Sequence, residues 1–381
     1  MVPEAAAYIS RRNGTTPRVE AKIEFGGGSM KLFKNKALLG AVTATAMLAM
    51  SWLAPAPARA DAVEDFYKGK SVTFLVSAPA GSLTDFVARN FAEHFKSHMA
   101  GHPNVVVLNL PGAGGMMAAA QLQLKEVKDG TVIGFLQRNN LYVPLVEGPK
   151  SGFDPRELQW LGSLEKVAYA MVAMNNSEVK TTADLFSKPL ILGATGYSNE
   201  NRTLPAMLND MIGTKFKIIH GYDARGEVYL AMERGEVDGW ASTVAGLTIP
   251  DTKQMLDQGR LKVLLHLGFE SPAPFDKVPN LSSYLKTPED KELYSFFTRS
   301  MVAGRPIGVP KGVPADRLAA LRKAFDESAA DPDFLSAMKA KDYPVEAVNG
   351  AAVEQVVKDL YATSDATMLK VRAIMTAKEP K

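Results

Sequence analysis

Short apolar runs alternate with amphipathic patterns along most of this chain, and this alternation constrains the fold more than any other feature. Short apolar runs that are bounded by turn residues are typical of buried strands. They predict strands at 72–76, 105–110, 132–136, 168–174, 190–192, 216–219 and 261–267. Because helical patterns separate many of these runs, we expect an α/β fold built from βαβ units with parallel sheets.

The helical patterns place apolar residues three or four positions apart, so that they share one face of a helix. The predicted apolar faces are Val87, Ala88, Phe91, Ala92, Phe95 and Met99; Val228, Ala231 and Met232; Leu318, Leu321 and Phe325; and Val353, Val356, Val357 and Leu360. Gly235 follows the second face and suits the left-handed turn that ends a helix. The turn-rich stretches 271–276 and 304–314 predict crossings between two lobes.

The first 60 residues have the pattern of a leader for export. Lysines within 31–36 precede an apolar run over 37–53, and the segment ends in Ala58-Arg59-Ala60. Basic, apolar and small-residue regions in this order are typical of a cleavable secretory signal. We therefore expect a signal peptide over 30–60, an exported mature protein, and an over-extended start or leader over 1–29. A membrane anchor is the alternative, because about 18 apolar residues can span a bilayer.

The expected mature chain has no excess of positive charge. Residues 1–60 hold eight of the 44 Lys and Arg residues and three of the 41 Asp and Glu residues. The other 36 basic and 38 acidic residues give a net charge of −2, whereas nucleic-acid binders concentrate positive charge. We therefore expect no nucleic-acid partner. The absence of cysteine excludes disulfides, thiolate metal sites and cysteine nucleophiles.

Two glycine-containing loops follow the first two predicted strands. The first is Ser77-Ala78-Pro79-Ala80-Gly81-Ser82-Leu83-Thr84-Asp85, which leads into a predicted helix. Backbone N–H groups and the dipole at a helix start favour an anion. Helix capping by Thr84 or Asp85 is the alternative interpretation. The second loop, Asn109-Leu110-Pro111-Gly112-Ala113-Gly114-Gly115, lies at a strand end, where open α/β sheets place ligands.

Common catalytic and cofactor motifs are missing from the sequence. Met117 stands where the second loop would need the third glycine of G-x-G-x-x-G, and there is no G-x-x-x-x-G-K-[ST] or G-x-S-x-G. His94, His98 and His102 are spaced by four, but Gly101 should end their helix before all three meet a metal. We expect no catalytic residue, no cofactor and no metal.

Several motifs, in order, resemble one receptor family. The segment 81–89, Gly-Ser-Leu-Thr-Asp-Phe-Val-Ala-Arg, is similar to G-G-x-x-D-x-x-A-R of the substrate-binding proteins of tripartite tricarboxylate transporters, the Bug receptors. The second loop resembles their N-x-P-G-A-G-G, and Lys-Asp-Gly-Thr-Val-Ile-Gly follows over 128–134. Gly221-Tyr222 and Gly235-Glu236-Val237-Asp238 resemble the G-Y and G-E-V-D elements of the family. The resemblance covers nearly the whole expected mature chain.

Two departures from the family pattern fall where a ligand would be touched. Ser82 replaces the usual second glycine of the first loop, and Tyr197-Ser198-Asn199-Glu200 stands where many members have S-x-x-H. The usual ligand of the family therefore does not carry over to this chain.

The resemblance implies two lobes of the type II periplasmic-binding-protein class, with a ligand cleft between them. Lobe 1 is expected over 61–172 and 292–381, and lobe 2 over 173–291. The family implies a small organic carboxylate held by backbone amides, hydroxyls and bridging waters, and no arginine clamp is evident in the sequence. Carried over by position, the ligand-binding residues are Ala80, Gly81, Ser82, Thr84, Asp85, Arg138 and Asn139 in the first lobe, and Ala194, Thr195, Ser198, Tyr222, Asp238 and Ser242 in the second.

Some of these residues have a second interpretation. Asp238 is also explained as a strand-end residue satisfied by turn amides, because a buried carboxylate would repel an acidic ligand. Tyr197, Tyr222 and Trp240 would stack on an aromatic acid or simply pack the lobe.

Three hypotheses for function follow. The first is a monomeric periplasmic receptor that closes on a carboxylate and delivers it to the membrane permease subunits of a tripartite transporter. The second is a sensory adaptor that presents the bound acid to a membrane receptor. The third is an exported enzyme, which is disfavoured because no nucleophile, base and orienting group can be assembled from the motifs.

Overall fold

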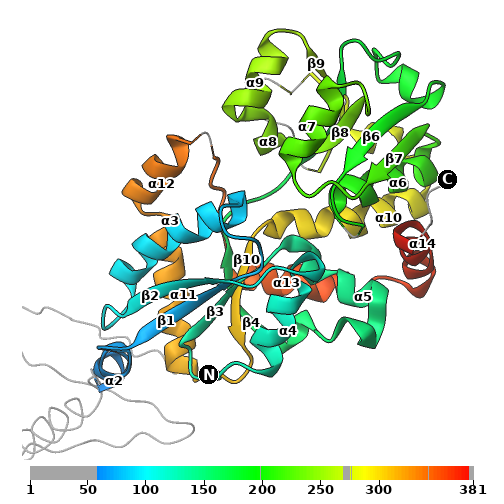
Figure 1. The fold of residues 1–381 in the computed structure, drawn as a ribbon. Coiled ribbons are helices and arrows are strands. Elements are labelled where there is room, and N and C mark those ends of the chain that lie inside the picture. The colour runs from blue at the N-terminus through cyan, green and yellow to red at the C-terminus, as the bar shows by residue number, and fades with distance from the viewer. Residues whose placement is uncertain (1–57, 198, 269–274, 276, 342, 377–381) are drawn as a thin grey trace, which may run out of the picture. The chain divides into compact units, whose positions relative to one another are not determined.

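The structure, a computed structural model, describes residues 58–197, 199–268, 275, 277–341 and 343–376. The expected leader and signal peptide lie outside the described residues, except for Ala58-Arg59-Ala60 at the start of helix α2 (Ala58–Tyr67). The described chain forms two lobes, each built on one sheet with helices packed against it (Figure 1). Among the helices described, none has the length and apolar composition needed to cross a membrane.

The first sheet has six strands in the order β11-β4-β10-β3-β1-β2. The strands are β1 (Ser71–Val76), β2 (Asn104–Asn109), β3 (Val132–Phe135), β4 (Leu158–Ser163), β10 (Pro306–Pro310) and β11 (Val348–Asn349). β1 pairs in parallel with β2 and β3, whereas β10 is antiparallel to both β3 and β4. The parallel strands β1, β2 and β3 therefore end at one edge, where the loops that follow them meet.

The second sheet has five strands in the order β7-β6-β8-β5-β9. The strands are β5 (Tyr169–Met174), β6 (Leu190–Ala194), β7 (Phe216–His220), β8 (Gly239–Thr243) and β9 (Leu261–Leu267). β6 is parallel to β7 and β8, and β5 is antiparallel to β8 and β9. The strands predicted from the sequence are all present, with ends shifted by two residues at most. Both sheets are mixed rather than parallel, because β5 and β10 enter them in the antiparallel sense.

The helices include each of the four predicted from apolar faces, as α3, α7, α11 and α13. Their bounds are α3 (Leu83–His98), α4 (Met116–Leu124), α5 (Val143–Glu147), α6 (Glu200–Ile212), α7 (Arg225–Glu233), α8 (Val244–Thr248), α9 (Pro250–Asp257), α10 (Pro288–Arg299), α11 (Ala315–Ala329), α12 (Pro332–Lys339), α13 (Gly350–Tyr361) and α14 (Asp365–Thr376). Short 3₁₀ helices follow some of the strands, among them η2 (Arg138–Leu141) after β3.

The stretch 304–314 is not the simple crossing that its prolines and glycines predict, because β10 occupies its middle. A Cβ at Gly308 would lie 2.9 Å from the Trp160 ring, so the glycine serves close packing within the sheet and not a turn. Pro306 and Pro310 stand at the two ends of the strand. The other predicted crossing, 271–276, lies outside the described residues apart from Phe275.

Two neighbouring segments carry the chain between the sheets. One connects β4 to β5 over 164–168, and the other precedes β10. The Val167 amide donates to the Met301 carbonyl (2.8 Å), and the Gly304 amide donates to the Glu165 carbonyl (2.9 Å). The lobe boundaries predicted from the sequence fall inside β5 and α10. We therefore propose that the lobes divide at these two hydrogen-bonded segments instead.

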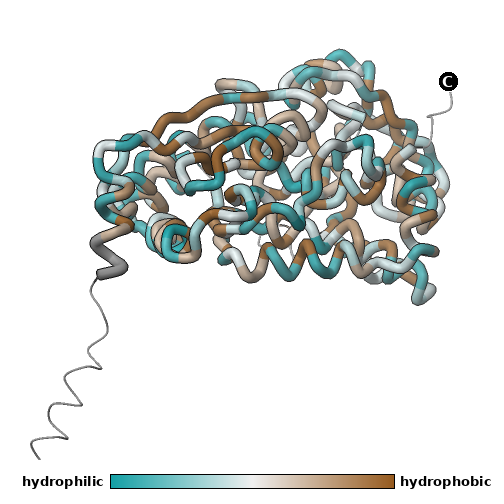
Figure 2. The backbone as a smooth tube through the Cα atoms, turned by 90° about the horizontal axis from the view of Figure 1, so that it is seen from below, coloured by the Kyte–Doolittle hydropathy of each residue, from teal (hydrophilic) through white to brown (hydrophobic). Residues whose placement is uncertain are grey.

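Apolar packing between the helices and the sheets fixes the strands whose ends carry the loops of the site. α3 and α11 pack on the first sheet, where the Phe91 ring lies 6.2 Å from Phe74 and 5.5 Å from Phe325. A further apolar cluster continues from Trp160 in the first sheet through Tyr169 to Leu192 in the second. Figure 2 shows hydrophilic and hydrophobic residues alternating along the helices, as expected for elements that bury one face.

Candidate functional site

The carboxylate of Asp85 holds the loop that follows β1. Its Oδ2 accepts hydrogen bonds from the Gly81 amide (2.8 Å) and from Arg89 Nε (3.0 Å). Burial raises the pKa of Asp85, but the hydrogen bonds from Arg89, Gly81 and Asn109 outweigh it and hold the pKa below its usual value. Ser82, not Thr84 or Asp85, caps α3, because its hydroxyl accepts from the Asp85 amide. Gly81 has a φ of +77°, a conformation that glycine adopts without strain.

The loops after β1, β2 and β3 are joined by side-chain amides. Asn109 Nδ2 donates to the Ala78 carbonyl (3.0 Å) and to Asp85 Oδ1 (2.9 Å). Asn139 Nδ2, in η2, donates to the Gly114 carbonyl (2.9 Å). The first-lobe positions predicted from the motifs therefore lie together at one sheet edge, where much of their hydrogen-bonding capacity serves to fix the loops to one another.

Arg138, in η2, forms a buried ion pair with Glu200, the first residue of α6. Arg138 Nη2 lies 3.1 Å from Glu200 Oε1 and donates to the Tyr169 hydroxyl at 2.6 Å. The Tyr142 hydroxyl donates to the same Glu200 oxygen at 2.9 Å. Burial alone would lower the pKa of Arg138, but Glu200 and the two tyrosines raise it above its ordinary value. The predicted ligand residue Arg138 thus already holds a carboxylate that belongs to the protein.

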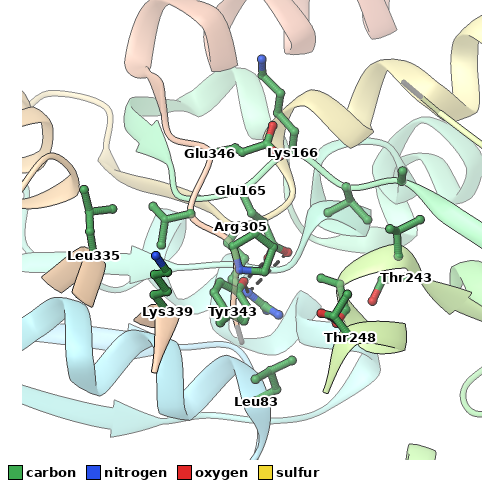
Figure 3. A pocket seen from close by; sticks show the side chains of 16 residues that line it. Leu83, Glu165, Lys166, Thr243, Thr248, Arg305, Leu335, Lys339, Tyr343 and Glu346 are labelled. Carbon is green, nitrogen blue, oxygen red and sulfur yellow. Dashed lines mark hydrogen bonds and ion pairs between the residues drawn. The ribbon is translucent and has the colours of Figure 1, made fainter. Parts of the chain in front are cut away.

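A cavity of about 530 Å³ lies among residues from both lobes and from the segments that join them (Figure 3). The start of α3, the end of α12 and the chain after it contribute from the first lobe, and the end of β8 and α8 contribute from the second. The lining residues are Leu83, Glu165, Lys166, Val167, Ala168, Thr243, Val244, Ala245, Thr248, Arg305, Leu335, Lys339, Tyr343, Pro344, Val345 and Glu346.

Arg305 is the most deeply buried cation of the cavity lining, with 13% of its side chain exposed. Its Nη1 donates to Thr84 Oγ1 at 2.6 Å, and its Nε donates to the Tyr343 hydroxyl at 2.7 Å. The sequence indicated no arginine clamp, and this residue was missed because it lies in the stretch taken for a crossing. A cation at the head of the short apolar run 306–309 is the signal that could have identified it.

Glu165 supports Arg305 from the segment between the lobes. Its Oε1 lies 3.4 Å from Arg305 Nε, and its other carboxylate oxygen accepts a hydrogen bond from the Tyr343 hydroxyl. Burial raises the pKa of Glu165 above its usual value, although Arg305 and Arg138 oppose this shift. The guanidinium of Arg305 is therefore held in one orientation by an acid, a phenol and the hydroxyl of Thr84.

In the second lobe, a backbone amide donates to the Asp238 carboxylate, as the alternative interpretation expects, but this amide belongs to strand β6 and not to a turn. Asp238 Oδ2 accepts from the Ile191 amide at 2.9 Å. The Ala194 carbonyl accepts from the amides of Gly221 (3.1 Å) and Tyr222 (3.3 Å), which joins the ends of β6 and β7. These contacts order the strand ends of the second sheet.

The hydroxyls predicted for the second lobe also have partners within the protein. Thr195 Oγ1 accepts from the Nδ2 atoms of Asn199 (2.8 Å) and Asn201 (2.9 Å). Ser242 Oγ donates to the Thr243 carbonyl at 3.0 Å. Trp240 is buried and packs beside Tyr229, with ring centroids 6.0 Å apart. Ser198 lies outside the described residues.

The cavity lining contains none of the ligand residues predicted from the motifs, although it contains their neighbours Leu83 and Thr243. Thr84 does not line the cavity, but its hydroxyl accepts a hydrogen bond from Arg305, which does. Ligand contact by the predicted residues stays a prediction.

The histidines spaced by four do not meet on one helix, because α3 ends at His98. His98 Nε2 instead lies 2.8 Å from Asp331 Oδ2.

We predict that Asp85→Asn lowers the free energy of unfolding by about 2 kcal/mol at pH 7, because it removes charge-assisted hydrogen bonds to a buried group. The folded pKa of Asp85 is depressed, so its contribution is complete above the unfolded pKa of about 3.9 and declines as the pH falls below it. Urea denaturation at pH 7 and pH 3 should show that the difference in free energy of unfolding between wild type and variant is smaller at pH 3. Asp65→Asn, at an exposed position of α2, is the control. A difference that does not change with pH contradicts this role.

We predict that Glu200→Gln lowers the free energy of unfolding by about 3 kcal/mol, because it leaves the buried guanidinium of Arg138 uncompensated. Glu354→Gln removes a carboxylate from a more exposed pair with Arg322 and should cost less than about 1 kcal/mol. Urea titrations of both variants measure the difference. Equal, small losses in the two variants would show that the buried pair does not hold η2 to α6.

Comparison with known proteins places the chain in one family. The model of the tripartite tricarboxylate transporter family receptor matches residues 87–372. A UPF0065 protein in the gbd 5' region of Cupriavidus necator is 27% identical over 304 residues, which cover 77% of this chain and 84% of that protein.

Solved structures share the fold. A TctC solute binding protein from Polaromonas superposes with a TM-score of 0.61 at 19% identity, over 81% of this chain and 99% of that one. R. palustris Rpa4515 with adipate superposes with a TM-score of 0.60 at 18% identity, over 80% of this chain and 97% of that one. The family match extends over most of the described lobes, so this chain belongs to the family of tripartite tricarboxylate transporter receptors.

Proposed function

We propose that this chain is a periplasmic solute receptor that captures a small organic carboxylate and delivers it to the permease subunits of a tripartite tricarboxylate-type transporter. The family match and the two-lobed fold support a binding role. A structural neighbour at 18% identity has adipate bound, which makes an organic acid a natural first ligand to test. The receptor acts as a monomer, binds without a cofactor and leaves its ligand chemically unchanged.

The observation that carries this proposal is the cavity beside Arg305. A guanidinium that is largely removed from water binds a carboxylate through short, charge-assisted hydrogen bonds. Residues from both lobes line the cavity, so a ligand there touches the two lobes at once. Contacts that form only when the lobes come together let a ligand shift the population toward a closed form.

The proposal predicts one acid bound per chain and uptake that depends on the chain. Melting curves with aliphatic and aromatic mono-, di- and tricarboxylates should identify acids that raise the midpoint, since a ligand of the folded state stabilises it. Calorimetry should then give a single site, and the acid should be recovered unchanged. Cells that lack this chain should lose uptake of the same labelled acid, and uptake should return when the chain is supplied.

The outcomes separate the competing functions. Tight binding with unaffected uptake would instead favour a sensory adaptor. Conversion of the acid to another compound would show an enzyme. If no carboxylate changes the melting curve, the chain is not an organic-acid receptor.

Export gives a separate prediction. The basic, apolar and small-residue regions over 30–60 should direct secretion and be removed after Ala60. The intact mass of protein recovered from the periplasm should match a chain that begins at Asp61. Retention of residues 31–60 would show that the segment is an anchor and not a cleaved signal.

A further inference from the structure

The cavity beside Arg305 has more apolar than charged side chains in its lining. Leu83 of α3 and Leu335 of α12 reach it from different helices and are 46% and 37% exposed (Figure 3). Val167, Val244 and Val345 line the same space. Single exposed leucines are ordinary on a protein surface. Val167 and Val244 also belong to buried apolar clusters, and Val345 packs against another, whereas the two leucines keep exposed apolar surface at the cavity.

One cation of the lining is both removed from water and oriented. Arg305 has five N–H groups, and Thr84, Tyr343 and Glu165 engage its Nη1 and Nε. Within the described residues, Nη2 of Arg305 has no hydrogen-bond partner, so its two N–H groups are available to a ligand. Lys166 and Lys339 also line the cavity, but both are exposed and therefore hydrated.

The size of the cavity exceeds what a four-carbon acid fills. Its volume of about 530 Å³ lies within the range of about 300–1,000 Å³ that is typical of pockets for drug-sized ligands. A short, fully polar acid would leave the exposed surfaces of Leu83 and Leu335 facing water. A longer apolar body would cover them.

We propose that this cavity selects a monocarboxylate with an apolar body, with the carboxylate on Nη2 of Arg305 and the body against Leu83, Val244, Leu335 and Val345. The inference rests on the proposed function, because it names the class of acid that the receptor takes. A second carboxylate on the same ligand would lie against the apolar wall without a buried partner, at a cost in desolvation. The cavity therefore discriminates against dicarboxylates of equal length.

Calorimetry with matched acids tests this selection on the wild-type protein. Hexanoate should bind at least about tenfold more tightly than adipate, which has the same six carbons and a second carboxylate. Octanoate should bind more tightly than hexanoate, by about fourfold for each added methylene. Octanamide, which lacks the negative charge, should bind much more weakly than octanoate.

Two pairs of variants assign the effect to this cavity. Arg305→Gln should weaken octanoate binding about 10- to 100-fold and abolish the preference over octanamide, while Lys217→Gln, at an exposed position of β7, should change neither. Leu335→Ser should weaken octanoate binding more than butyrate binding. Leu369→Ser, at an exposed leucine of α14, should leave both unchanged. Melting curves without ligand check that each variant is folded, and the leucine variants test the proposal even if Arg305→Gln does not fold.

Failure of this inference is distinct from failure of the proposed function. Tighter binding of adipate than of hexanoate, lost in Lys339→Met, would overturn the monocarboxylate assignment and keep the organic-acid receptor. Binding of octanoate that is unaffected by both Arg305→Gln and Leu335→Ser would place the ligand elsewhere and overturn the inference. If neither the monocarboxylates nor the dicarboxylates bind, the proposed function fails as well.

Discussion

The cost of keeping charges out of water determines how the two lobes meet. Two ion pairs are largely buried there, one between Arg138 and Glu200 and the other between Arg305 and Glu165. Arg138 and Glu165 also interact electrostatically with each other, so the two pairs are linked. A buried charge is tolerated only with a partner. These four residues come from η2, the start of α6 and the two segments that join the sheets, so satisfying the charges requires those elements to lie together.

The sequence predicts strands and helices well where the signal is local. The apolar run 261–267 forms a strand with the predicted bounds, and the apolar face of α3 packs on the first sheet as its spacing requires. β10 was missed because its Pro and Gly residues are typical of a loop. Only its position between β3 and β4, contacting Trp160 from a distant part of the chain, makes those residues suitable for a strand.

The candidate site is likewise predictable from the sequence only where the signal is local. The motifs locate the loops after β1 and β2, because glycine, asparagine and aspartate at strand ends are readable in sequence. They do not reveal which group each side chain contacts. Arg305 and its acceptor Thr84 are 221 positions apart, and the partner of Arg138 is Glu200, at a departure from the family pattern. Such pairings depend on the assembled lobes and have no local signature.

The two buried arginines consequently have different roles. Glu200 supplies Arg138 with a permanent carboxylate, and an external acid would have to displace it and leave its charge buried without a partner. Arg305 is oriented by neutral hydroxyls and by Glu165, whose charged form is disfavoured by burial. A ligand carboxylate at Arg305 adds a partner without removing one. Arg138 therefore binds a carboxylate of the other lobe, and we propose that Arg305 is kept for an incoming anion.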